Sequence, residues 1–236
     1  MPFSRNKEEQ IKIFQDKIQY NFKAPELVVE ALTHSSYANE TKNRKFPYNE
    51  RLEFLGDSVL SLIISDYIFN KYKHLPEGEL TKVRANVVCE ASLASVAKKI
   101  SIGDFLMLGK GEELSGGRKR TSILADAFEA LIGAIYTDGG LELARKFVLD
   151  NLLDLIELAS NGELYKDYKT HLQELLQSKT TEKIAYRVIK EMGPDHDKTF
   201  EVEVCLGGQT LGTGSGKSKK EAEQNAAQEA IQKVRR

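Results

Sequence analysis

The sequence predicts a multidomain protein, with an all-α domain followed by a small α+β domain whose element order is α-β-β-β-α. Residues 1–158 place apolar side chains at helical spacing, whereas residues 165–236 contain runs in which polar and apolar side chains alternate. Between them, Ala159-Ser-Asn-Gly162 has the most linker-like composition of the chain. We therefore expect a first domain over 1–158, a linker over 159–164 and a second domain over 165–236.

The first half of the N-terminal domain is predicted to contain three helices. Apolar residues at helical spacing open two helices near Ile11 and Leu27, and a polar loop over 39–49 precedes a third helix over 50–73. That third helix is apolar on nearly every face, which is typical of a central core helix or of a helix at an interface. Pro76-Glu-Gly78 ends it.

The second half of this domain is also predicted to be helical. One helix is expected over 79–100, followed by a loop over 109–120 that is rich in glycine and basic residues. An apolar helix then starts near residue 122 and stops at Thr137-Asp-Gly-Gly140, and a last helix covers 141–158.

The C-terminal domain is predicted to have a helix at each end and three strands between them. Apolar and polar residues alternate from Thr199 to Leu206, as in a strand with one buried face. Alanines recur at every fourth position from Ala222 to Ala230, which indicates a packed helix face. The expected elements are a helix over 169–176, strands over 184–190, 199–206 and 209–212, and a closing helix over 222–234.

Composition restricts the functional classes only weakly. The chain has 236 residues and a formal net charge of −1, so any nucleic-acid-binding surface must be local rather than a property of the whole chain. Cys89 and Cys205 lie far apart and outside any zinc-type spacing, so neither a disulfide framework nor a zinc site is expected. No membrane-spanning run or leader is recognisable, and we expect a soluble, cytoplasmic protein.

Two apolar helical stretches each carry a pair of acids on one face. Glu53 and Asp57 are four residues apart, and Asp126 and Glu129 are three residues apart. Burying neighbouring carboxylates is unfavourable unless a cation or a proton compensates them. Hard cations such as Mg²⁺ bind carboxylates, and they can activate a water and stabilise the leaving oxygen of a phosphodiester. The pattern predicts a metal-dependent hydrolase.

Spacing alone leaves a second interpretation of the four acids open. They could be solvated, or they could form salt bridges to Arg51, Lys82 or Arg84. In that case the helices need no metal.

A second group of polar residues lies in the C-terminal domain. Three lysines precede or open the closing helix, where unpaired backbone N–H groups and the helix dipole attract anions. Such a charge run is usually a solvated helix end, but the α-β-β-β-α order favours a phosphate-binding role. Two glutamines on the first helix and a histidine between the first two strands would provide further contacts to an A-form duplex. The candidate RNA-binding residues are Gln173, Gln177, His196, Lys217, Lys219 and Lys220.

Several stretches together resemble one known family. The most specific is Glu50-Arg-Leu-Glu-Phe-Leu-Gly-Asp-Ser-Val-Leu60, and the others, in order along the chain, are 31–36, 122–133, 166–174 and 212–224. On these residues the chain resembles bacterial ribonuclease III over its whole length. The resemblance implies a helical endonuclease domain followed by a double-stranded-RNA-binding domain.

The resemblance also implies roles for the acids. Glu53, Asp126 and Glu129 are expected to bind Mg²⁺, with Mn²⁺ as an alternative ion, and Asp57 is expected to complete the acidic site. Asp57 and Glu129 are the expected catalytic residues. Glu77 matches a further acid of the family, which is expected to act through the outer shell of the metal; its Pro-Glu-Gly context otherwise indicates a turn.

Phe54 matches a family position that packs into the partner subunit of a homodimer, although a core phenylalanine is the alternative. The activity implied is Mg²⁺-dependent hydrolysis of both strands of double-stranded RNA, which leaves 5′-phosphates and short 3′ overhangs. The expected processes are the maturation of ribosomal RNA precursors and the processing of messenger RNA. Two alternatives are a duplex-RNA-binding protein that does not cut, against which the intact acids argue, and a metal hydrolase of small phosphoesters.

Overall fold

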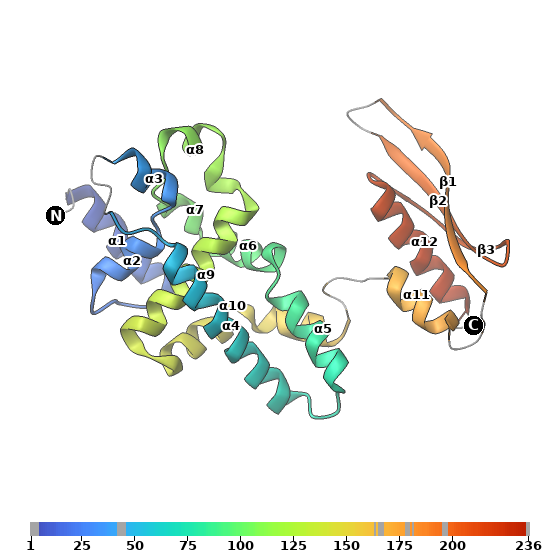
Figure 1. Ribbon diagram of the computed structural model, residues 1–236, viewed down its shortest axis with the longest axis horizontal. Coiled ribbons are helices and arrows are strands. Elements are labelled where there is room, and N and C mark those ends of the chain that lie inside the picture. Colours follow the sequence, from blue (N-terminus) through green and yellow to red (C-terminus); the bar gives the residue numbers. More distant parts are fainter. Residues whose placement is uncertain are drawn as a thin grey trace. The chain divides into compact units, whose positions relative to one another are not determined.

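The computed structural model describes residues 5–41, 46–162, 164, 168–177, 180, 182–194 and 198–234, without the side chains of 5–7, 171 and 174. The chain divides into two compact units, Met1–Leu164 and Tyr165–Arg236, and each unit has its own hydrophobic core. The first unit is helical and the second combines three strands with two helices (Figure 1), which confirms the predicted fold class. No helix among the described residues is long and apolar enough to cross a membrane.

The helical unit is organised around two long helices, α4 (Glu50–Lys71) and α9 (Thr121–Gly139), which pack against each other. The apolar residues of α9 are almost all buried, so this helix forms the centre of the core. The other helices surround this pair: α1 (Arg5–Ile18), α2 (Pro25–Ala31), α3 (Ser35–Glu40), α5 (Glu77–Val87), α6 (Glu90–Lys99), α7 (Ile102–Phe105), α8 (Lys110–Leu114), the 3₁₀ helix η1 (Gly117–Lys119) and α10 (Leu141–Ser160).

Helix α4 is buried on one side and exposes an apolar stripe on another. The side chains of Phe54, Leu62 and Phe69 are 79%, 55% and 68% exposed. Their spacing of eight and seven residues places them on one face of the helix. The apolar character predicted for nearly every face of this helix therefore has two separate causes, a core face and an unpartnered stripe.

The single helix predicted over 79–100 is in fact two helices, α5 and α6. The break falls at Val88 and Cys89, and Cys89 has an extended backbone. The hydroxyl of Ser92 donates to the carbonyl oxygen of Asn86 at 2.7 Å and so satisfies one of the last carbonyls of α5. A local side-chain hydrogen bond thus replaces a continuing helical turn, and the apolar spacing alone did not reveal it.

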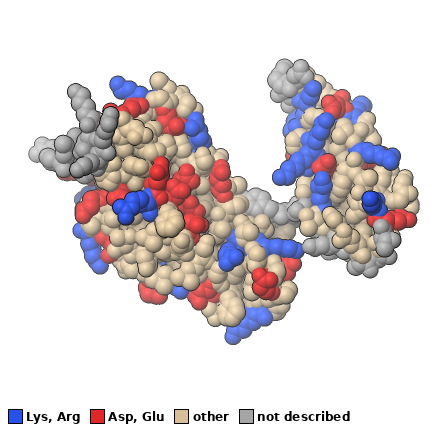
Figure 2. Space-filling model, in the orientation of Figure 1, with Lys and Arg blue, Asp and Glu red and all other residues tan. Residues whose placement is uncertain are grey.

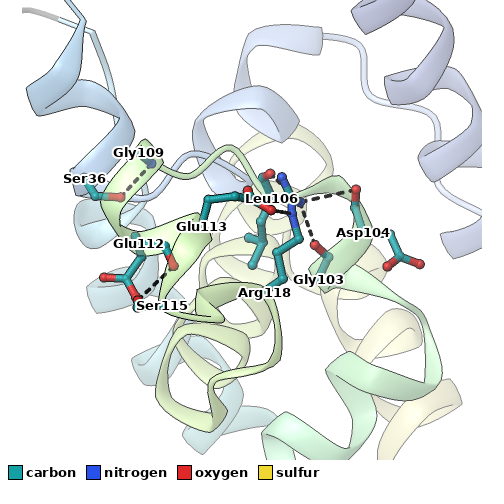
Figure 3. A network of polar contacts seen from close by, with 9 residues as sticks. All are labelled: Ser36, Gly103, Asp104, Leu106, Gly109, Glu112, Glu113, Ser115 and Arg118. Atoms are coloured by element: carbon teal, nitrogen blue, oxygen red, sulfur yellow. Dashed lines mark hydrogen bonds and ion pairs between the residues drawn. The ribbon is translucent and has the colours of Figure 1, made fainter.

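The predicted loop over 109–120 is also more ordered than expected, because it contains α8 and η1. Arg118 holds this segment together (Figure 3). Its Nη1 donates to the carbonyl oxygens of Gly103 and Leu106, both at 2.9 Å, and its Nε donates to Glu113 at 2.5 Å. The arginine thereby ties the segment to α7 and to the residue that follows it. At the end of the unit, α10 continues to Ser160, two residues into the stretch predicted to be a linker.

The second unit is a three-stranded antiparallel sheet in the order β1-β2-β3, with two helices against one face (Figure 1). Leu172 and Leu176 from α11, Val202 and Val204 from β2, and the alanines of α12 form its core. The elements are α11 (Tyr168–Gln177), β1 (Ile184–Met192), β2 (Thr199–Leu206), β3 (Gln209–Gly216) and α12 (Lys219–Val234).

Strand β3 extends to Gly216, four residues beyond the predicted end. Its glycines lie against α12, because a Cβ on Gly212 would be 2.6 Å from the carbonyl oxygen of Ala226 and one on Gly214 would be 2.2 Å from the nitrogen of Ala226. Glycine is needed here for a close approach of two backbones rather than for a turn. The predicted end of the strand was wrong because a glycine-rich sequence occurs both in turns and where two backbones approach closely.

Candidate functional site

The acids of the helical unit are brought together where α4 and α9 cross in backbone contact. Each helix has a glycine at the crossing, and a Cβ on Gly133 would lie 2.2 Å from the carbonyl oxygen of Leu52. Glu53 lies three residues before Gly56, and Glu129 lies four residues before Gly133. The acids therefore share the helix faces that meet at the crossing.

Three of the predicted acids form a close cluster. Carboxylate oxygens of Glu53, Asp126 and Glu129 all lie within 4.8 Å of one another, and the three side chains are half-buried. Asp57 is exposed and, among the described residues, is not part of this group. Figure 2 shows acidic side chains gathered on the visible face of the helical unit, in the region of α4 and α9.

Glu77 lies outside the cluster as well. It is exposed at the first position of α5, and its carboxylate accepts a hydrogen bond from the hydroxyl of Thr81 at 2.9 Å. The Pro-Glu-Gly segment is therefore the start of a helix, where an acid is favoured by the helix dipole, rather than an isolated turn.

Burial raises the pKa values of all three clustered carboxyl groups. Burial raises the pKa of Glu129 to about 8, and the neighbouring charges of Asp57, Glu53 and Asp126 contribute to the same shift. Burial is also the largest cause of the raised pKa of Glu53 and of Asp126. Such a cluster is stable at neutral pH when a proton or a cation neutralises part of its charge.

Two of the three cations that could have neutralised the acids by salt bridges are engaged elsewhere. Lys82 forms an ion pair with Glu79 at 3.1 Å, and Arg84 donates to the hydroxyl of Ser65 at 3.1 Å. Across the residues that the structure describes, no lysine or arginine, Arg51 included, forms an ion pair with any of the four acids. A half-buried group of carboxylate oxygens without a cationic side chain fits a hard divalent cation.

Two residues near the acids were not predicted from the sequence. Glu90, the first residue of α6, raises the pKa of Asp126, and His34, at the N-terminal cap of α3, lowers it. His34 lies within the stretch 31–36 that resembles the family, and this resemblance could have indicated it. Nothing in the sequence around Glu90 indicated a place near the acids. Both depend on where the tertiary structure places α3 and α6 relative to Asp126, which helical spacing does not report.

The predicted lysines of the second unit are exposed at the start of α12. Ser218 accepts a hydrogen bond from the backbone N–H of Glu221 at 3.2 Å, and the carboxylate of Glu221 accepts one from the backbone N–H of Lys217 at 2.7 Å. This reciprocal capping starts the helix at Lys219. Lys217, Lys219 and Lys220 are therefore grouped around a helix N-terminus, which attracts anions.

One of these lysines is already engaged within the unit. The Nζ of Lys219 lies 3.0 Å from the carboxylate of Glu191 on β1 and 5.4 Å from the centroid of the Phe200 ring. The other candidate positions on α11, Gln173 and Gln177, are exposed one turn apart. The remaining candidate, His196, lies outside the described residues.

Comparison with known proteins agrees with this arrangement of two units. Residues 24–156 match the Ribonuclease-III-like family, and residues 168–234 match the Double-stranded RNA binding motif. A helical unit that matches the Ribonuclease-III-like family and carries an acidic cluster, together with a unit that matches a double-stranded-RNA-binding motif, defines the class as that of ribonucleases III. The chain belongs to the ribonuclease III family.

Relatives match the chain over nearly its whole length. It is 57% identical over 220 residues to Ribonuclease 3 of Caldanaerobacter subterraneus subsp. tengcongensis, which covers 93% of this chain and 96% of that protein. It is 51% identical over 229 residues to Ribonuclease 3 of Clostridium tetani, which covers 97% of each. Among solved structures, it resembles the nuclease domain of ribonuclease III from Campylobacter jejuni, with a TM-score of 0.56, 42% identity, and coverage of 62% of this chain and 96% of that one.

Proposed function

We propose that this chain is an endoribonuclease that hydrolyses phosphodiester bonds on both strands of double-stranded RNA. The observation that carries the proposal is the meeting of three half-buried carboxylates from α4 and α9, in a chain that also has a double-stranded-RNA-binding motif. The expected substrates are ribosomal RNA precursors and structured messenger RNA.

In this proposal Glu53, Asp126 and Glu129 hold Mg²⁺, for which Mn²⁺ is an alternative. The bound ion supplies Lewis-acid stabilisation of the reacting phosphate and activation of a water. Glu129, whose pKa is about 8, gives up its proton as the site takes up the cation. Asp57 is exposed beside Glu129 and orients the attacking water by accepting a hydrogen bond, and Glu77 supports the site from the outer shell.

The second unit binds the duplex. Its lysines, at the N-terminus of α12, contact phosphates, where both their charge and the helix dipole are favourable. The exposed glutamines on α11 reach 2′-hydroxyl groups and base edges in the minor groove, which distinguishes an RNA duplex from DNA. The proposed contacts are Gln173, Gln177, His196, Lys217, Lys219 and Lys220.

Cutting both strands requires two acidic sites, and we propose that a homodimer supplies them. The two strands of a duplex are antiparallel and related by local two-fold axes, so a dimer with two-fold symmetry matches the substrate. The exposed stripe of Phe54, Leu62 and Phe69 offers an apolar surface for the dimer, and Phe54 lies next to the acid Glu53. In this arrangement the products carry 5′-phosphates and short 3′ overhangs.

Cleavage of a labelled RNA duplex tests the proposal. The full chain is incubated with the duplex in Mg²⁺, in Mn²⁺ and in EDTA, and the products are resolved on a denaturing gel. We expect cleavage of both strands in either metal, none in EDTA, and none of the corresponding single strands. Binding of the duplex without cleavage in both metals would instead identify an RNA-binding protein that does not cut. Cleavage of small phosphoesters without duplex binding would identify a different hydrolase.

A further inference from the structure

Lys169, the second residue of α11, joins three elements of the unit that carries the RNA-binding motif. Its Nζ lies 2.6 Å from the carboxylate of Glu223 on α12 and 4.5 Å from the ring centroid of Tyr186 on β1. Its backbone N–H is one of the first amides of α11, which have no partner within the helix, and it donates to the side chain of Gln224 at 3.2 Å. A single residue thus attaches the start of α11 to both α12 and the sheet.

Each residue of the ion pair lies within two helical turns of one group of proposed RNA contacts. On α11, Lys169 is one turn before Gln173 and two turns before Gln177. On α12, Glu223 is one turn after Lys219. How α11 is rotated and shifted against α12 therefore decides whether the glutamines and the lysines face the same duplex.

Charge makes the position of Glu223 unusual. A carboxylate beside lysines that bind phosphates would by itself weaken RNA binding, because it reduces the local positive potential. Its side chain and that of Lys169 are only 27% and 34% exposed, so water screens their interaction less than it would at an open surface. Lys169 is engaged by a carboxylate and an aromatic ring, and it is thereby held away from the role of a phosphate contact.

We propose that the Lys169–Glu223 pair is a positioning device of the RNA-binding surface, which aligns the glutamines of α11 with the lysines at the start of α12. The pair acts through these contacts and does not itself bind RNA. This inference rests on the proposed function of the second unit, which is to bind the RNA duplex.

The test is the affinity of the full chain for a duplex RNA in EDTA, measured by fluorescence anisotropy at several salt concentrations. The variants are Glu223→Gln, Lys169→Met and the charge swap Lys169→Glu with Glu223→Lys. Each single variant should weaken binding, and the swap should recover it, with a coupling of roughly threefold or more in Kd. The dependence of log Kd on log salt should stay unchanged in the single variants, because the lysines of α12 keep their phosphate contacts and the displaced α11 loses only its uncharged glutamine contacts.

Glu223→Gln separates positioning from simple electrostatics. Removal of an acid beside the lysines should tighten RNA binding if charge alone matters, whereas loss of the alignment weakens it. The matched control is Lys233→Met, which breaks the ion pair between Lys233 and Glu229 (2.9 Å) near the other end of the same helix and should leave affinity unchanged.

Circular dichroism and thermal melting of each variant confirm that the unit is folded, and Glu223→Gln keeps the test valid if the swapped protein does not fold. Unchanged or tighter binding by folded Glu223→Gln would overturn the inference. The inference would also be overturned if Lys169→Met lowered the salt dependence of binding by the equivalent of about one phosphate contact, because Lys169 would then bind RNA directly. Failure of the unmodified chain to bind duplex RNA would instead contradict the proposed function.

Discussion

The backbone of Glu129 rests against Gly56, so closely that a Cβ on Gly56 would lie 1.8 Å from the carbonyl oxygen of Glu129. The same residue, Glu129, contributes its side chain to the acidic cluster. The contact that sets the separation of α4 and α9 therefore also sets the distance between the carboxylates on the two helices. Any change that separates the helices should disturb the site as well as the core.

We expect Gly56→Ala to destabilise the protein and to reduce cleavage together. The added methyl group meets backbone rather than a flexible side chain, so the helices must shift, at a cost of roughly 1–3 kcal/mol or more. Thermal unfolding and the cleavage assay measure the two effects. The control is Gly78→Ala in α5, where a Cβ meets nothing within 4 Å and better helix propensity should stabilise the helix slightly. Equal stability of the two variants would show that the crossing is not tightly packed.

We expect the metal-free protein to lose stability as the pH rises from about 5 to about 8. The carboxyl group of Glu129 titrates near 4.5 in the unfolded chain and near 8 in the folded one, so in this range the folded state holds a proton that the unfolded state releases. Raising the pH then favours unfolding. The full shift would correspond to roughly 3.5 kcal/mol across the range, and solvent screening of this partly exposed side chain reduces the expected loss to on the order of 2 kcal/mol. Urea unfolding in EDTA measures the slope, which Glu129→Gln should flatten. A stability that rises across this range in the unmodified protein would contradict the assignment.

We expect Glu129→Gln to abolish cleavage while duplex binding stays nearly intact. The amide keeps the shape of the side chain but removes the charge of a proposed metal ligand, whereas we expect the binding energy to come mainly from phosphate contacts in the other unit. Gel cleavage in saturating Mg²⁺ and anisotropy in EDTA measure the two properties. Retained turnover would remove Glu129 from the mechanism.

We expect deletion of residues 165–236 to leave a folded nuclease that works only at low salt. The helical unit has its own core and holds all the clustered acids, whereas the lysines proposed to contact phosphates lie in the deleted unit. Since loss of phosphate contacts weakens binding most as salt rises, activity should fall at physiological salt. Cleavage rates across a salt series decide this. A truncated protein as active as the full chain at high salt would show that the second unit does not provide the main binding of the duplex.

We expect Phe54→Ala to weaken dimerisation without unfolding the protein. Because Phe54 is largely exposed in the single chain, truncation removes little from the core, but in an interface it would remove a buried aromatic anchor worth about 2 kcal/mol or more. Light scattering against concentration should show a dimer for the unmodified chain and more monomer for the variant. An unmodified chain that stays monomeric at micromolar concentration and still cuts both strands would refute the dimer.

Phe54 also shows how a sequence pattern can have two structural meanings. The sequence left a core phenylalanine as an alternative to an interface residue, and both satisfy the same apolar spacing. The structure decides against the core within a single chain, because the side chain is exposed on α4. Helical spacing reports which residues share a face, but it does not report which faces find a partner.

The sequence by itself determined the order of the long helices and of the strands, and the pairing of acids within each helix. Both are local properties, since a helical period places residues three and four apart on one side, and alternation identifies strands. For the same reason Glu53 with Asp57 and Asp126 with Glu129 were predictable as pairs. The family resemblance came from local motifs of this kind.

Only the tertiary structure decided which of these acids meet. Glu53 joins Asp126 and Glu129, whereas Asp57, one turn further along α4, stays outside the cluster. The reason is that the position at which two helices cross depends on the packing of both surfaces, here on a glycine in each helix. The attachment of Lys169 to Glu223 is of the same kind, because it joins residues fifty-four positions apart that no local period relates.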